Sequence, residues 1–113
     1  MHELSVTQSI LEIALRHAEK ANAHRITDLY LVIGQLSSIV DDSVEFYWDI
    51  IAKETIAAGA NLHFKRLPIE VLCLECENRF NPNNGDYTCP QCRSSQIKIV
   101  QGEEFLLEAI NIE

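Results

Sequence analysis

Four cysteines form two closely spaced pairs late in the chain. The pairs are Cys73-x2-Cys76 and Cys89-x2-Cys92, and twelve residues separate them. Two residues between cysteines allow a tight knuckle to aim both sulfurs at one ion, and four thiolates complete a tetrahedral shell. The spacing therefore predicts a structural Zn(II) site with these four cysteines as ligands.

A metal held by four cysteines has no open position for water or substrate. Such a metal stabilises a fold and does not catalyse a reaction. Thioredoxin-like redox chemistry is disfavoured, because it normally needs one C-x2-C motif at the start of a helix. Iron stays open as an alternative, since a rubredoxin-type electron carrier uses the same four sulfurs.

A second candidate site lies at the start of the chain, where Met1 is followed by His2 and Glu3. The bulk of His2 predicts that Met1 is retained. The Met1 amine, the backbone nitrogen and imidazole of His2, and the backbone nitrogen or carboxylate of Glu3 can all reach one ion. Nitrogen-rich, tetragonal ligand sets favour Ni(II) or Cu(II). Taken alone the motif is weak, and a solvated chain end is the simpler interpretation.

Other histidines and acidic residues have simple structural interpretations. His17 lies in the apolar stripe of a predicted helix, which favours a packed core histidine, and His24 falls near the end of that helix. His63 is predicted on a half-exposed strand as an ordinary surface residue. Asp41 and Asp42 could assist a cation if their loop folded towards the N-terminus, but helix capping explains them better.

Two helices are expected from the hydrophobic periodicity. Apolar residues at three- and four-residue steps predict a helix from Ser5 to about His24, and Ser5 with Gln8 fits a capping box. The same steps predict a second helix over residues 43–58. Here Asp42 and Glu45 repeat the capping-box spacing, and a glycine at position 59 supplies the stop.

Three strands are expected around a loop-rich insertion that contains all four cysteines. The predicted strands are Ile26–Ile33, Asn61–Leu67 and Phe105–Ile112. We therefore predict an α+β fold: a small mixed three-stranded sheet with two helices, plus an inserted zinc-ribbon-like lobe. The expected domains are residues 1–68 with 103–113, and residues 69–102.

The composition of the chain excludes further classes of function. The 113 residues carry 17 Asp plus Glu against 9 Lys plus Arg, a formal charge of −8. This balance argues against nucleic acid and suits cations or basic partners. No apolar run reaches the roughly 18 residues that would predict a membrane span, and no signal-peptide pattern precedes the first helix, so a cytoplasmic protein is expected. No catalytic triad, phosphate loop or paired-carboxylate motif is present, which predicts a protein that is not an enzyme.

Both ends of the chain together resemble the HypA/HybF family, the nickel metallochaperones of [NiFe]-hydrogenase maturation. The resemblance rests on Met1-His2-Glu3-Leu4-Ser5 opening a helix, on Cys73-x2-Cys76 and Cys89-Pro90-x-Cys92-x-Ser94, on Gly34, and on the ending Gly102-x-Glu104-Phe105-x-Leu107-x-x-Ile110. The chain departs from the pattern at Glu77, where relatives usually carry a glycine after the second cysteine. That departure concerns the geometry of the first knuckle.

This resemblance implies a nickel-binding α/β domain and an inserted zinc lobe. It implies Ni(II) as transient cargo at His2, with Met1 and Glu3 backbone nitrogens and the Glu3 carboxylate in support. It also implies Zn(II) at the four cysteines. The implied partners are the nickel-loading GTPase HypB and the precursor of the hydrogenase large subunit, with urease as a further client in some organisms.

Two questions stay open at this point. A zinc-ribbon interaction module or nucleic-acid-binding module is the alternative function, although residues 69–102 hold only three Lys or Arg against four acidic residues. The oligomeric state is a monomer or a dimer, and the insertion topology allows exchange of segments between chains.

Overall fold

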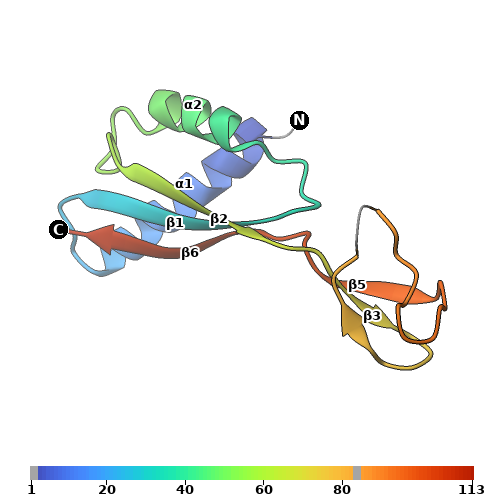
Figure 1. The fold of residues 1–113 in the computed structure, drawn as a ribbon. Coiled ribbons are helices and arrows are strands. Elements are labelled where there is room, and N and C mark those ends of the chain that lie inside the picture. Colours follow the sequence, from blue (N-terminus) through green and yellow to red (C-terminus); the bar gives the residue numbers. More distant parts are fainter. Residues whose placement is uncertain (1–2, 83–84) are drawn as a thin grey trace. The chain divides into compact units, whose positions relative to one another are not determined.

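The computed structural model describes residues 3–82 and 85–113 (Figure 1). Their elements, in order, are α1 (Glu3–Lys20), β1 (Ile26–Gly34), α2 (Asp41–Ile51), β2 (Asn61–Leu67), β3 (Glu70–Cys73), β4 (Arg79–Phe80), β5 (Ile97–Gln101) and β6 (Phe105–Ile112). The described chain forms two compact units. We call them the helical unit (residues 3–32, 38–65 and 105–113) and the cysteine unit (residues 33–37 and 66–104). Neither described helix is long and apolar enough to cross a membrane.

The helical unit is built on a three-stranded sheet in the order β2-β1-β6 (Figure 1). β1 and β2 run parallel and β6 runs antiparallel to β1, so the sheet is mixed as predicted. Hydrogen bonds near the two ends of each strand pair establish these directions. In the parallel pair, the Gln35 N–H donates to the Leu67 carbonyl, and the His63 side chain bonds to that of Asp28. In the antiparallel pair, the Gly34 N–H donates to the Glu104 carbonyl and the Glu113 N–H to the Arg25 carbonyl.

One hydrophobic core joins the helices to this sheet. β1 contributes Leu29 and Leu31, which alternate with the polar-tipped Asp28 and Tyr30, so the first pair faces the helices and the second faces away. The buried members of the core are Ile10, Leu11, Ala14, Ala18, Ile26, Leu29, Leu31, Trp48, Ala52 and Ala57. The predicted α+β fold is therefore confirmed, with strands β2 and β6 at the predicted residues.

Helix α1 differs from its prediction at both ends. It begins at Glu3, so Ser5 lies inside the helix and the predicted capping box is wrong. It ends at Lys20 because Asn22 adopts a left-handed conformation with φ 55°. The N–H of Ala23 then donates to the carbonyl of Ala18 at 2.9 Å, a bond that closes a helix and prevents its continuation.

Helix α2 ends at Ile51, seven residues before the predicted end. A turn follows the helix. In it the Thr55 hydroxyl donates to the Ala52 carbonyl at 2.8 Å and accepts from the Ala57 N–H at 3.0 Å, so these backbone groups bond to a side chain and do not continue the helix. The predicted cap is also wrong: Val40 is the N-cap, and no side chain makes a capping hydrogen bond.

The cysteine unit contains a second small sheet in the order β4-β3-β5, antiparallel throughout. At its base, a Cβ added to Gly34 would lie 2.1 Å from the backbone carbonyl of Gly102, and only a residue without a side chain permits this approach. The Leu36 N–H donates to the Gly102 carbonyl at 2.7 Å. Two chain segments that are distant in sequence are therefore joined at this point.

Candidate metal centre

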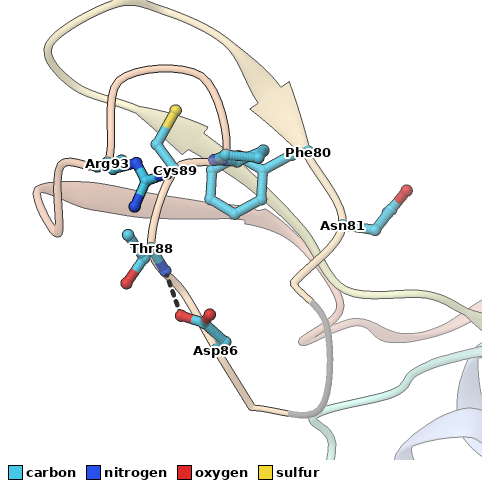
Figure 2. A pocket seen from close by; sticks show the side chains of 7 residues that line it. Phe80, Asn81, Asp86, Thr88, Cys89 and Arg93 are labelled. Atoms are coloured by element: carbon cyan, nitrogen blue, oxygen red, sulfur yellow. Dashed lines mark hydrogen bonds between the residues drawn. The ribbon is translucent and has the colours of Figure 1, made fainter.

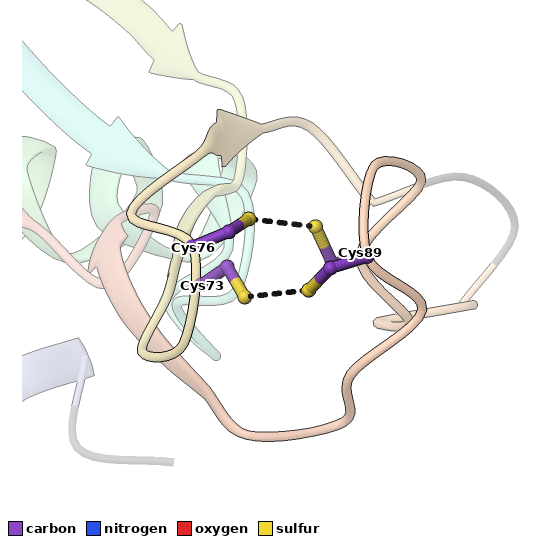
Figure 3. A group of neighbouring side chains, drawn as sticks. Cys73, Cys76 and Cys89 are labelled. Atoms are coloured by element: carbon purple, nitrogen blue, oxygen red, sulfur yellow. Dashed lines mark hydrogen bonds between the residues drawn. The ribbon is translucent and has the colours of Figure 1, made fainter.

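The four cysteine sulfurs lie together in the cysteine unit, all within 4.8 Å of one another (Figure 3). The sulfurs of Cys73 and Cys92 are 3.4 Å apart and those of Cys76 and Cys89 are 3.6 Å apart. A disulfide needs about 2.05 Å, whereas thiolates on a tetrahedral ion at about 2.3 Å lie about 3.8 Å from each other. All four cysteines are free. Their arrangement matches ligands of one metal ion.

Two backbone knuckles with the same hydrogen bonds position the sulfurs. In the first, the Cys73 carbonyl accepts from the Glu77 N–H at 3.0 Å, and in the second the Cys89 carbonyl accepts from the Arg93 N–H at 2.8 Å. Glu77 and Arg93 both have φ 63°, a left-handed conformation in the residue after the second cysteine. Glu77 therefore adopts the left-handed conformation that a glycine favours.

Contacts between the knuckles hold the pairs together. The Asn78 side-chain amide points at the Cys89 sulfur, 3.8 Å away. The Ser94 hydroxyl donates to the Glu75 carboxylate, which connects the second knuckle to the first. Side-chain contacts therefore connect the two knuckles in addition to the cysteines.

Backbone amides and neighbouring sulfurs act in opposite directions on the thiols. The Cys76 N–H lowers the pKa of Cys73. Burial opposes ionisation of Cys89, but N–H groups that include that of Cys92 lower its pKa to about 6. The Ser94 N–H favours the thiolate of Cys92, yet the other three sulfurs and burial raise its pKa to about 12. Four thiolates this close require a cation to offset their repulsion.

The cysteine unit has little other interior. Among its described residues the buried apolar side chains are Ile33, Val71, Cys73 and Cys89. An open cavity of about 470 Å³ lies beside the second knuckle, lined by side chains that include Phe80, Asp86 and Arg93 (Figure 2). Small units with so few buried apolar groups usually need a further source of stability, such as a bound metal ion.

The predicted nickel ligands Met1 and His2 lie outside the described residues. Glu3, the third residue of that motif, opens α1. Asp41 and Asp42 occupy the first turn of α2, where a negative charge stabilises the helix through its dipole. His17 is exposed, so its predicted place in the core is wrong.

Sequence reasoning missed a polar network on the sheet face away from the helices. The His63 Nε2 lies 2.9 Å from a carboxylate oxygen of Asp28, and its ring stacks on Tyr30 with centroids 4.6 Å apart. The Asn111 amide donates to the Tyr30 hydroxyl at 3.0 Å. These residues come from three strands, so no local sequence pattern connects them.

Comparisons with known proteins agree on one family. A family model described as hydrogenase/urease nickel incorporation, metallochaperone, hypA, matches residues 1–112. The chain is 40% identical to the hydrogenase maturation factor HypA of Caldanaerobacter subterraneus subsp. tengcongensis over the full length of both proteins. It is 33% identical to the hydrogenase maturation factor HybF of Escherichia coli, again over the full length of both.

Solved structures are similar over nearly the whole chain. The solution structure of the Ni metallochaperone HypA from Helicobacter pylori is 29% identical, with a TM-score of 0.71, and the match covers 99% of this chain and 97% of that one. A second solution structure, of a HypA protein, is 30% identical with a TM-score of 0.81, over 100% of this chain and 97% of that one.

Proposed function

This chain belongs to the HypA family of nickel metallochaperones in hydrogenase maturation, and on that premise we propose that it takes up Ni(II) at its N-terminus and passes it on. The observation that carries the proposal is the family match over residues 1–112, a range that includes His2 and all four cysteines. The role is that of a carrier and not of a catalyst. We place this work in the cytoplasm, where nickel enzymes would be assembled.

Nickel is proposed to bind the His2 imidazole together with backbone nitrogens of residues 1–3. Such a nitrogen set suits tetragonal Ni(II). The N-terminus of α1 has a positive dipole that disfavours a cation, and the Glu3 carboxylate offsets this effect. A site with one imidazole at a chain end holds its ion through few side chains, which favours release to a partner.

Zinc is proposed to bind Cys73, Cys76, Cys89 and Cys92. Support comes from the sulfur separations of 3.4 and 3.6 Å and from four sulfur donors within 4.8 Å. When bound, zinc would supply fixed tetrahedral coordination to the cysteine unit. This ion would be resident, in contrast to the nickel cargo. Metal analysis distinguishes it from iron, which the same donors accept and which would colour the protein red.

The nickel assignment is tested by titrating Ni(II) into wild type, His2→Ala and His17→Ala while zinc content is monitored. His17 is an exposed histidine of α1 and provides the matched control. We expect His2→Ala to lose at least tenfold in nickel affinity and His17→Ala to bind as wild type does. Equal binding by all three proteins would show that the assignment is wrong.

A second variant tests whether the Met1 amine is a nickel ligand. Residues added before Met1 convert the amine to an amide, and nickel binding should weaken although every side chain is retained. Unchanged binding would remove the amine from the ligand set and leave the imidazole assignment standing.

Delivery is proposed to involve the GTPase HypB and the hydrogenase large-subunit precursor, with urease as a further client. The family description names hydrogenase and urease together. Transfer of nickel from this protein to purified precursor, with and without HypB, tests the proposal. The alternative zinc-ribbon or nucleic-acid role is not favoured, since the family match and the charge of −8 both oppose it.

A further inference from the structure

Strand β6 is an edge strand. It is the last strand in the order β2-β1-β6, and no other strand of the described residues pairs with its outer side. Edge strands present unpaired backbone N–H and C=O groups that can bond to a strand from another molecule. Many proteins protect such edges with Lys, Pro or a covering element, and Phe105–Ile112 contains neither Lys nor Pro.

A groove runs between this edge and helix α1. Two adjoining hollows of about 330 and 270 Å³ share Ile13 and Leu107 as lining residues. We call them together the β6 groove, formed by Ile10, Ile13 and His17 of α1 and by Phe105, Leu107 and Ala109 of β6. All of these residues belong to the helical unit. Main-chain groups at the edge and apolar hollows beside it are the two parts of a strand-binding site.

The groove keeps apolar side chains in contact with solvent. Ile13 is 37% exposed and Leu106, which lines the first hollow, is 44% exposed. An extended partner with an apolar residue at every second position would place those side chains over Ile13 and Leu107, which line both hollows, because alternate side chains of a strand point to the same face.

The negative charge in and beside β6 favours some binding partners over others. Residues 102–113 contain Glu103, Glu104, Glu108 and Glu113 and no Lys or Arg. An antiparallel second copy centred on Glu108 would place Glu108 opposite itself and Glu103 opposite Glu113. Like charges placed opposite each other destabilise a strand pair, so pairing of β6 with its own copy is disfavoured.

We propose that the β6 groove binds an extended segment of another protein in which apolar residues alternate with Lys or Arg. The segment adds a fourth strand to the sheet. Its apolar residues fill the two hollows, and its cations face Glu108 of β6 and Glu113, which follows β6. No residue that lines this surface is a proposed metal ligand.

The test uses the full-length zinc-loaded chain and two labelled peptides of equal charge, KVKIKVK and KPKPKPK. Proline has no N–H and cannot complete a ladder, so the second peptide measures attraction by charge alone. We expect KVKIKVK to bind at least tenfold more tightly in fluorescence anisotropy. It should also slow deuterium uptake in residues 105–112, which KPKPKPK should leave unchanged.

Two variants locate the site, with circular dichroism and zinc content as checks of folding. Ile13→Lys should weaken KVKIKVK about tenfold, whereas Ile50→Lys, at an exposed position of α2 outside the groove, should bind as wild type does. Equal binding of both peptides, a loss on Ile50→Lys alone, or protection of residues 105–112 that grows with protein concentration without peptide would each overturn the proposal.

Discussion

The helical unit and the cysteine unit are stabilised by different interactions. The helical unit packs two helices on a sheet around Trp48, Leu29 and Leu31, which are 1% exposed or less. In the cysteine unit, two of the four buried apolar residues, Cys73 and Cys89, are members of the four-cysteine cluster that is proposed to bind zinc. We therefore expect one unit to fold by burying apolar surface and the other by binding an ion, which would give a single chain two independent requirements for stability.

The largest effect should come from removing a metal ligand. Cys89→Ser takes away one donor of four, and we expect loss of the ion and of ordered structure in residues 70–101. The binding free energy of a structural zinc is on the order of 10 kcal/mol, more than the unit can replace. Zinc content and deuterium uptake measure both effects. Continued protection of residues 70–101 from deuterium exchange without metal would contradict the expectation that the metal stabilises the cysteine unit.

A core substitution should have the converse effect. Leu29 is fully buried in the helical unit, and Leu29→Ala should lower the free energy of unfolding of that unit by about 2–5 kcal/mol. Zinc content should stay at one ion per chain. Leu74→Ala, at a 55% exposed position of the cysteine unit, is the control and should change stability by less than about 0.5 kcal/mol. Thermal unfolding followed by Trp48 fluorescence measures the helical unit. If zinc is lost with Leu29→Ala, the two units are not independent.

A smaller effect is expected from substituting the left-handed residue of the first knuckle. Glu77 has φ 63°, a conformation that costs a residue with a Cβ about 1–2 kcal/mol. Glu77→Gly removes this cost but adds flexibility to the unfolded chain, so a net gain of about 0.5–1 kcal/mol in metal retention is expected. Competition with a chelator measures it. Arg93→Gly should act in the same direction, and weaker retention in both variants would contradict the role of the left-handed residue.

The smallest effect concerns pH and the polar face of the sheet. The hydrogen bond from His63, with that from Thr27, lowers the pKa of the Asp28 carboxyl. Because the folded pKa is depressed, the stabilisation is present at neutral pH and is lost as the pH falls below about 4 and through the folded pKa. Nuclear magnetic resonance titration of Asp28 in His63→Ala should give a higher pKa than in wild type. An unchanged value would mean that His63 is not the principal partner.

Much of the fold could be predicted because strand patterns are local. Alternation and flanking turn residues located β2 and β6 at their observed bounds, and the paired spacing of the cysteines located the metal cluster. Helix ends were predicted less well. A threonine hydroxyl at Thr55 and a left-handed Asn22 ended the helices, and neither is a strong signal in a single sequence.

What the sequence could not predict depends on contacts between distant segments. His63, Asp28 and Tyr30 meet only because β1 and β2 pair in one register. His17 has the spacing of a core residue, but it lies at the border of the apolar stripe and is exposed. The β6 groove likewise needs α1 and β6 side by side, although nearly a hundred residues separate them in sequence.

The joint at Gly34 and Gly102 has a consequence for the order of events during synthesis on the ribosome. β1 and β2 emerge early, but their sheet lacks β6 until after the cysteine segment has emerged. That segment can capture its ion first. Since the Leu36 N–H bonds to the Gly102 carbonyl, closing the cysteine unit brings the start of β6 next to the end of β1. Pairing of β6 with β1 then closes a loop of a few residues, whereas without the folded cysteine unit it would close a loop of about seventy residues. We therefore expect metal capture to speed the folding of the nascent chain.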